Sequence, residues 1–202
     1  MIAARKAMIT AGYLLKEDLF MPTKKQLHTR NLIIQTMYGL LQHKPFSAIT
    51  TADICSAAAI HHTTFYRYFT DKYALLGATL TDTCAPIITL MTQGMTFLDA
   101  LLQLIDQNRT VMLNITAHNQ RNDVYYDLVQ IFAQQLTLAA TTEITMTDPL
   151  LVKLQAADNL DYAAHAVAGM IVGVLIGWAD GSRSAEPNDL QTLFSERFLQ
   201  LL

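Results

Sequence analysis

One aromatic-rich segment stands out, and its residues 61–72 read His61-His62-Thr63-Thr64-Phe65-Tyr66-Arg67-Tyr68-Phe69-Thr70-Asp71-Lys72. Phe65 and Phe69 lie four positions apart, so both side chains share one face of a helix. That face can anchor the helix in a core, together with Ile54 and Ile60. We therefore predict a short helix that ends at Phe69 and gathers its polar residues at the amino-terminal end.

Two further helices are predicted before this segment. The first carries an apolar stripe and stops at His43-Lys44-Pro45; the stripe comprises Leu27, Ile33, Ile34, Met37, Leu40 and Leu41. The second opens at Thr50-Thr51-Ala52-Asp53, which has the capping-box pattern of a hydroxyl followed three residues later by a carboxylate, and runs through Ala57 or Ala58. A break at residues 59–61 follows. One long helix and two short ones joined by a tight turn form a helix-turn-helix unit.

Helical spacing continues after the segment. Asp71 is placed to cap a helix from Lys72 to about Met91, with a kink at Pro86. The later predicted helices cover residues 98–115, 124–139, a short piece after Asp148-Pro149, about 160–180 up to Gly181, and a last stretch from Pro187 or Asn188. The fold class is all-α. We predict an amino-terminal extension (residues 1–21), a helix-turn-helix domain (22–72) and a second helical domain (73–202).

The composition is that of a folded protein. Of the 202 residues, 51% are hydrophobic and 15% are charged, which excludes wholesale disorder. The longest apolar run, Ala166 to Ala179, is shorter than the roughly 20 residues that a membrane span needs. Residues 1–20 lack a signal-peptide pattern, and two cysteines are too few for a disulfide scaffold or a zinc site. We expect a cytoplasmic protein with no membrane, metal or cofactor.

Charge is distributed unevenly along the chain. Residues 21–80 carry six cations and two anions, a net charge of +4, whereas residues 81–202 carry a net charge of −8. A basic head on an acidic body is typical of a protein that binds a polyanion with the head alone. Chance variation of surface charge is the alternative explanation.

The aromatic helix offers groups that suit DNA. Its amino-terminal end, where a recognition helix meets base edges, carries His61, His62, Thr63 and Thr64. The hydroxyls of Tyr66 and Tyr68 can donate to phosphates, and Arg67 can reach a phosphate or a guanine. Lys72 begins the next helix, where the helix dipole favours an anion. Simple packing remains open for the tyrosines and simple solvation for the histidines.

These motifs resemble the TetR family of transcriptional regulators. The match runs from Lys24 to Leu76 and rests on Thr50-Thr51-Ala52-Asp53-Ile54-Cys55 and Thr64-Phe65-Tyr66-Arg67-Tyr68-Phe69-Thr70-Asp71-Lys72. The later stretches Leu104–Arg109 and Gly173–Trp178 resemble the subgroup that includes the dihydroxyacetone-kinase regulators.

The resemblance implies roles for individual residues. Phosphates would be held by Thr50 or Thr51, Tyr66, Tyr68 and Lys72, while the major groove would be faced by His61, His62, Thr63 and Arg67. The family often has glycine in the turn where Ala59 stands. An alanine in a left-handed conformation costs on the order of 1 kcal/mol, so either the turn is strained or it is built differently.

The resemblance also implies that residues 22–72 are the DNA-binding domain and that residues 73–202 bind an effector and form a homodimer. Gly169, Gly173 and Gly177 recur every four residues and allow close helix packing; with Leu190, Leu193, Phe194 and Phe198 they form the expected dimer interface, ordinary packing within the chain being the alternative. A small-molecule effector would lie among Met91, Met95, Met112, Asn114, His118, Tyr125, Tyr126 and His165, each of which can instead be ordinary core.

The sequence thus predicts a homodimeric regulator that binds a palindromic operator in double-stranded DNA, a repressor relieved by an unknown small molecule. An activator that works through a partner protein is a variant of this reading. The alternative is a ligand- or protein-binding module with a degenerate DNA-binding head, which Ala59 and the modest charge of the head would allow. No enzyme is expected, because the sequence has no Gly-rich phosphate loop and no recognisable acid–base pair.

Overall fold

A computed structural model describes residues 23–116, 122–142 and 148–179, and every regular element in these ranges is a helix. The helices before the central kink are α2 (Lys24–Leu41), the 3-10 turn η1 (Phe46–Ala48), α3 (Thr51–Ala57), α4 (His62–Tyr66) and α5 (Lys72–Cys84). After it come α6 (Pro86–Thr92), α7 (Phe97–Gln107), α8 (Arg109–Thr116), α9 (Asn122–Ala140), α10 (Pro149–Gln155) and α11 (Leu160–Ala179). The predicted all-α class is confirmed.

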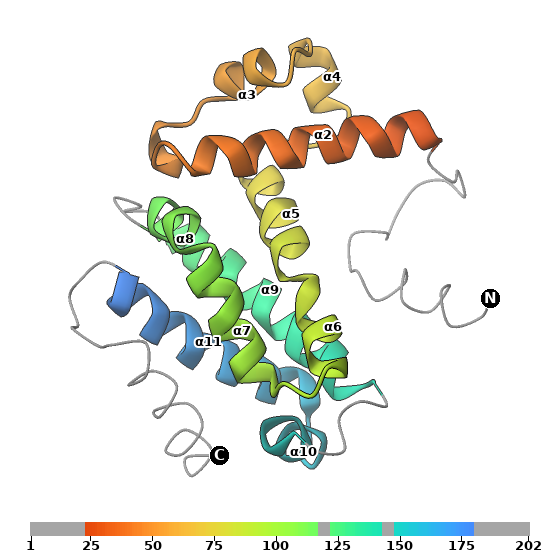
Figure 1. Cartoon of the computed structure of the whole chain (residues 1–202), viewed down its shortest axis with the longest axis vertical. Coiled ribbons are helices and arrows are strands. Elements are labelled where there is room, and N and C mark those ends of the chain that lie inside the picture. Colours follow the sequence, from red (N-terminus) through yellow and green to blue (C-terminus); the bar gives the residue numbers. More distant parts are fainter. Residues whose placement is uncertain (1–22, 117–121, 143–147, 180–202) are drawn as a thin grey trace.

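The helices form a head and a body that share one helix. Figure 1 shows α3 and α4 on one side of α2, and the remaining helices on its other side. Helix α5 starts beneath α2 and continues into the body, where it packs against α9. Because the apolar side chains of head and body belong to one continuous buried cluster, the head is held rigidly on the body.

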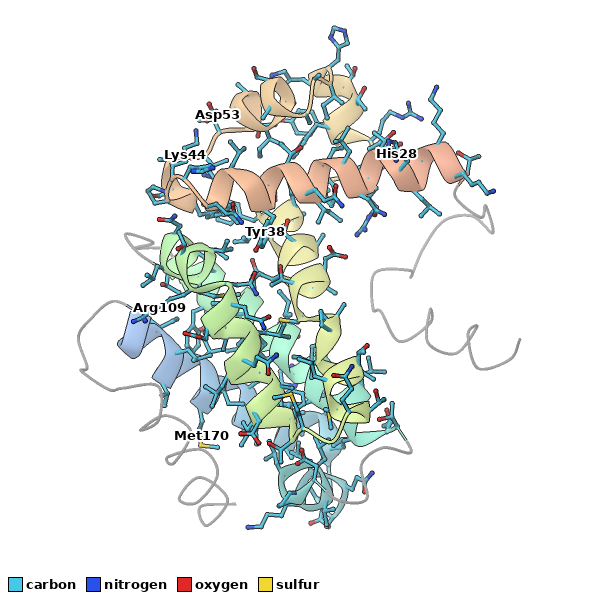
Figure 2. All side chains as sticks on the ribbon, in the orientation of Figure 1. His28, Tyr38, Lys44, Asp53, Arg109 and Met170 are labelled. Atoms are coloured by element: carbon cyan, nitrogen blue, oxygen red, sulfur yellow. The ribbon has the colours of Figure 1, made fainter. Side chains whose placement is uncertain are left out.

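Two hydrogen bonds reinforce the joint between head and body. The hydroxyl of Tyr38, which projects from α2 toward the body (Figure 2), donates to Asn108 Oδ1 over 2.7 Å. The amide of Asn114 on α8 donates over 2.8 Å to the carbonyl of Leu41, the last residue of α2. Both bonds thus join α2 to the body, at α8 and at the residue that precedes it.

The predicted helix caps are confirmed. Thr50 and Asp53 form the capping box of α3, and Asp71 Oδ1 accepts from Tyr73 N and Ala74 N, both over 2.8 Å. The helix after Asp71 divides at Pro86 as predicted, since α5 ends at Cys84 and α6 begins at the proline. Polar side chains that satisfy free backbone N–H groups thus set several of the helix starts.

Two predicted helices have different bounds in the structure. Helix α4 ends at Tyr66 instead of Phe69, because the N–H groups of Arg67 and Tyr68 bond to carbonyls only three residues back and tighten the chain into a turn. The single helix predicted over residues 98–115 is two, α7 and α8. It breaks at Asn108, whose side-chain amide donates to the Leu104 carbonyl over 2.6 Å and so competes with the helix backbone.

Two helical stretches, 72–92 and 160–177, are long and apolar enough to cross a membrane by length and composition, although the longest continuous apolar run in the sequence is only Ala166 to Ala179. Both stretches contribute to the shared core: Leu75, Leu76 and Leu80 from the first, and Val167 and Ile171 from the second, are at most 1% exposed. Core helices of soluble proteins have the same composition, so the two stretches alone do not indicate a membrane.

Candidate nucleic-acid interface

Helix α4 is held in the head by Phe65 within it and by Phe69 in the turn that follows it. Phe65 is fully buried and Phe69 nearly so, with ring centroids 6.1 Å apart. The guanidinium of Arg30 on α2 lies 5.5 Å from the centre of the Phe69 ring. Since a five-residue helix is not stable alone, this burial determines which side of α4 faces solvent. The predicted anchoring face is confirmed.

The side chains predicted to contact DNA from residues 61–68 divide into two groups. Five of them are exposed: His61, His62, Thr63, Tyr66 and Arg67. The rings of Tyr66 and Phe65 pack edge to face, with their centroids 5.3 Å apart. Thr64 is half-buried, and Tyr68 packs partly against the core. Simple packing therefore accounts for much of Tyr68, whereas Tyr66, with 57% of its surface exposed, is open to a partner.

The turn between α3 and α4 is built as the glycine-containing version would be. Ala59 has a positive φ of 52°. The N–H of Ile60 donates to the Cys55 carbonyl over 3.0 Å and that of Ala59 to the Ser56 carbonyl over 3.2 Å, the two bonds of a Schellman motif. The turn keeps its geometry with alanine, which carries the left-handed strain instead.

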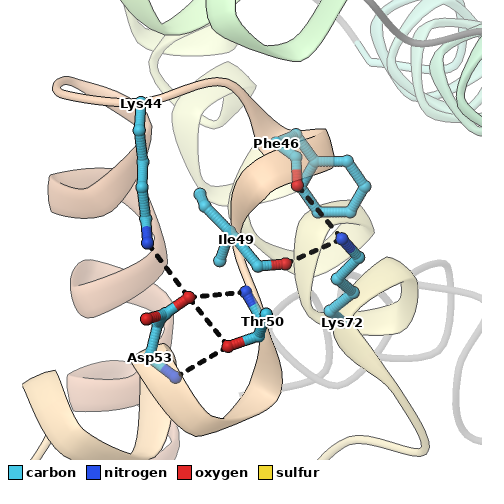
Figure 3. Close-up of polar contacts among 6 residues, drawn as sticks. All are labelled: Lys44, Phe46, Ile49, Thr50, Asp53 and Lys72. Atoms are coloured by element: carbon cyan, nitrogen blue, oxygen red, sulfur yellow. Dashed lines mark hydrogen bonds and ion pairs between the residues drawn. The ribbon is translucent and has the colours of Figure 1, made fainter.

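The amino terminus of α3 is fixed by a small polar network (Figure 3). Asp53 Oδ2 accepts from the Thr50 N–H and the Thr50 hydroxyl, both over 2.8 Å, and lies 3.0 Å from Lys44 Nζ. The bond from the Thr50 N–H, followed by those from the Thr50 hydroxyl and Lys44, lowers the pKa of Asp53 to about 2. The Thr50 hydroxyl proton is thus already donated to Asp53, while Thr51, one residue on, is half-buried.

Lys72 does not point freely into solvent. Its ammonium donates to the carbonyls of Phe46 and Ile49 over 3.1 and 2.7 Å (Figure 3). The N–H groups just after it, which the sequence suggested for an anion, are bonded to the Asp71 carboxylate. The structure thus brings Lys72 to the base of α3 and not to the exposed face of α4.

The body contains a narrow apolar pocket of about 30 Å³ between α7, α8, α9 and α11. Its walls are Ile105, Met112, Thr116, Leu128, Phe132, Val172, Leu175 and Ile176. Only Met112 belongs to the predicted effector set. The other wall residues have the helical apolar spacing of ordinary core, so no signal in the sequence distinguished them.

The other predicted effector residues are dispersed. Met91 is buried, Met95 half-buried, and Asn114 bonded to Leu41. Tyr125 and Tyr126 are exposed, and His165 Nε2 lies 3.3 Å from Gln130 Oε1. None of them lines the apolar pocket. His118 is outside the described residues.

The glycine stripe on α11 does not share one environment. Gly169 faces Tyr125 of the same chain, whose hydroxyl donates to the Gly169 carbonyl over 3.3 Å. Gly173 is exposed and Gly177 is buried. A Cβ at Gly169 would lie 3.7 Å from the Tyr125 hydroxyl, an ordinary van der Waals distance, so this contact within the chain does not require a glycine. The other predicted interface residues, Leu190, Leu193, Phe194 and Phe198, lie outside the described residues, as does the extension 1–21.

Metal and redox chemistry have no support in the part of the chain that the structure describes. No three His, Cys, Asp or Glu residues gather there closely enough to hold a metal ion. Cys55 and Cys84 are buried free thiols, and burial raises the pKa of Cys84 to about 12. A thiol with so high a pKa is a poor nucleophile at neutral pH.

Comparison with known proteins agrees with this geometry. Residues 33–79 match the family model described as bacterial regulatory proteins, tetR family. A putative TetR-family transcriptional regulator from Syntrophomonas wolfei str. Goettingen is similar in structure, with a TM-score of 0.58 and 17% identity over 86% of this chain and 94% of that one. The dihydroxyacetone kinase operon activator DhaS is also similar in structure, with a TM-score of 0.51 and 16% identity over 87% of this chain and 96% of that one. No curated protein matches the sequence significantly.

The strain at Ala59 predicts the effect of a glycine there. Ala59→Gly should raise the free energy of unfolding by about 1 kcal/mol, because glycine adopts a positive φ without the steric cost that alanine incurs. Urea denaturation measures the change. Ala57→Gly, in the last turn of α3, is the matched control and should lower stability by about 0.5–1 kcal/mol. A destabilising Ala59→Gly would contradict the left-handed turn.

The capping network predicts a dependence on acid pH. Because the pKa of Asp53 falls from 3.8 to about 2 on folding, the carboxylate stabilises the fold above pH 3.8, and this contribution is lost as the pH falls toward about 2. Wild type should therefore exceed Asp53→Asn in melting temperature above pH 3.8, and the difference should shrink across that range. A difference that stays constant down to pH 2 would show that the charged carboxylate is not what stabilises α3.

Proposed function

We propose that this chain, a TetR-family protein and thus a member of a family of DNA-binding transcriptional regulators, is a homodimeric, cytoplasmic repressor. A small molecule would release it from a palindromic operator. The observation that carries the proposal is the amino-terminal half of α4. Exposed His61, His62 and Thr63 stand on a helix whose opposite face is locked in the core by Phe65. A recognition helix requires this combination of a rigid back and a polar, accessible front.

The charge pattern favours the same reading. The basic region, with a net charge of +4 over residues 21–80, covers the head and most of α5, whereas residues 81–202 have a net charge of −8. Such a molecule approaches DNA head first, and binding should weaken steeply with salt because phosphate contacts release counterions. Two linked heads would read two half-sites about one DNA turn apart, which is the reason to propose a homodimer.

The effector response has a structural basis in α8. The helix supplies Met112 and Thr116 to the apolar pocket, and its Asn114 donates to the end of α2. At about 30 Å³ the pocket has room for no more than a few water molecules. A larger apolar ligand must displace its walls, and a displaced α8 would pull on α2. A ligand that favours the displaced arrangement would lower the affinity for DNA.

A module with a degenerate DNA-binding head is the competing proposal. Its main support was Ala59, but the turn around Ala59 keeps both bonds of the Schellman motif. The exposed face of α4 is likewise intact. We therefore favour a functional head.

The proposal is tested by asking which genomic fragments the purified protein retains after washing at about 0.15 M salt, where nonspecific binding is weak. Enrichment of one palindrome is expected. A folded protein that enriches no sequence would support the competing module.

Variants of the exposed face separate positioning from sequence reading. Tyr66→Phe should weaken binding to every sequence, since it removes only a hydroxyl that donates to phosphate. His62→Ala and Arg67→Ala should each change the preferred base at one position, with a discrimination of about 1–3 kcal/mol. Competition binding on operator variants measures both effects. The control is His43→Ala, an exposed histidine outside α4; equal effects in all four variants would contradict the assignment.

The link through α8 predicts the behaviour of the effector response. For a compound that raises the melting temperature and releases DNA, Asn114→Ala should leave ligand binding in place but reduce the ligand's effect on DNA affinity about fivefold, because α8 no longer holds the end of α2. Calorimetry and DNA titrations give the two numbers. Gln107→Ala, an exposed neighbour on α7, is the control. Full release in Asn114→Ala would place the coupling elsewhere.

A further inference from the structure

Lys72 occupies a small site between the loop before α3 and the start of α5. Two carbonyl oxygens, of Phe46 and Ile49, accept from its ammonium, which also lies 4.6 Å from the centre of the Phe46 ring and 5.7 Å from that of Tyr73. The two rings meet edge to face at 5.2 Å. Carbonyl oxygens and ring faces both attract a cation, so this site holds the ammonium without any phosphate.

The bond to Ile49 has a particular consequence for α3. The Ile49 carbonyl and the Thr50 N–H belong to one planar peptide unit. Lys72 binds the carbonyl side of that unit over 2.7 Å, and Asp53 Oδ2 accepts from its N–H side over 2.8 Å (Figure 3). The peptide that leads into α3 is therefore held from both edges, by α5 on one side and by the capping box on the other.

We propose that Lys72 is a positioning residue, which fixes the Ile49–Thr50 peptide and thereby the amino terminus of α3, and not a phosphate ligand. The role rests on the proposed function, since α3 supports the recognition helix α4 through the turn at Ala59. The residue then affects DNA binding through the loop that it holds, while its own ammonium is bonded to the Phe46 and Ile49 carbonyls.

The first test is made on the free protein. Lys72→Met keeps an unbranched stem and removes the ammonium, so amide hydrogen exchange at Ile49 and Thr50 should become about tenfold faster. Lys25→Met, an exposed lysine in the first turn of α2, is the matched control and should leave these amides unchanged. Unchanged exchange in Lys72→Met overturns the proposal.

The second test is the salt dependence of binding to the enriched palindrome. A phosphate ligand contributes about 0.9 to the slope of log affinity against log salt. Because residues 46–53, the segment that Lys72 holds, contain no Lys or Arg, a displacement of this segment removes no cation from the DNA interface. Lys72→Met should therefore lower affinity about tenfold at each salt concentration with an unchanged slope. A slope smaller by about 0.9 for each bound protomer would identify a phosphate ligand and overturn the proposal.

The variant Lys72→Arg provides a test that still applies if the neutral variant Lys72→Met does not fold. Arginine keeps the charge for a phosphate, but its planar guanidinium cannot replace a compact ammonium between two carbonyls and two rings. Positioning predicts fast exchange and reduced affinity in this variant as well, whereas wild-type affinity would overturn the proposal. If the wild-type protein binds no DNA, the proposed function fails, and the exchange measurement still decides whether Lys72 holds the loop.

Discussion

The burial of Phe65 and Phe69 is the interaction on which the head depends. Five residues make too few hydrogen bonds for α4 to persist by itself, so its position and rotation come from the two rings in the core. Once the rings are placed, His61, His62 and Thr63 are exposed as a consequence. The surface that we assign to DNA is thus the reverse side of a hydrophobic anchor, and it is only as well defined as that anchor is rigid.

The connections around α4 extend this rigidity to the rest of the molecule. On one side the left-handed Ala59 closes α3 with two hydrogen bonds. On the other, α5 begins in the head and ends in the body, and Tyr38 and Asn114 bond α2 to the body helices. These contacts give a ligand in the body a physical route to the head, because a displaced α8 would disturb the bond that holds the end of α2.

Local chemistry explains which features the sequence could predict. The caps at Thr50 and Asp71, the kink at Pro86 and the anchoring face of α4 each depend on residues a few positions apart, so their patterns are legible in the chain. The bond from Tyr38 to Asn108, by contrast, joins residues 70 positions apart, and the Lys72 site depends on carbonyls more than 20 positions earlier. The pocket in the body is formed by four helices at once, and its apolar walls have the same spacing as ordinary core. Tertiary contacts of this kind leave no local signature.

The central claim is that the exposed front of α4 reads DNA, and the structure of the protein bound to its enriched palindrome tests it most directly. The account predicts the amino-terminal half of α4 from each of two protomers in successive major grooves, with His61, His62 and Thr63 toward the base edges and the body away from the duplex. A complex in which another surface lies on the DNA, with α4 facing solvent, would contradict it.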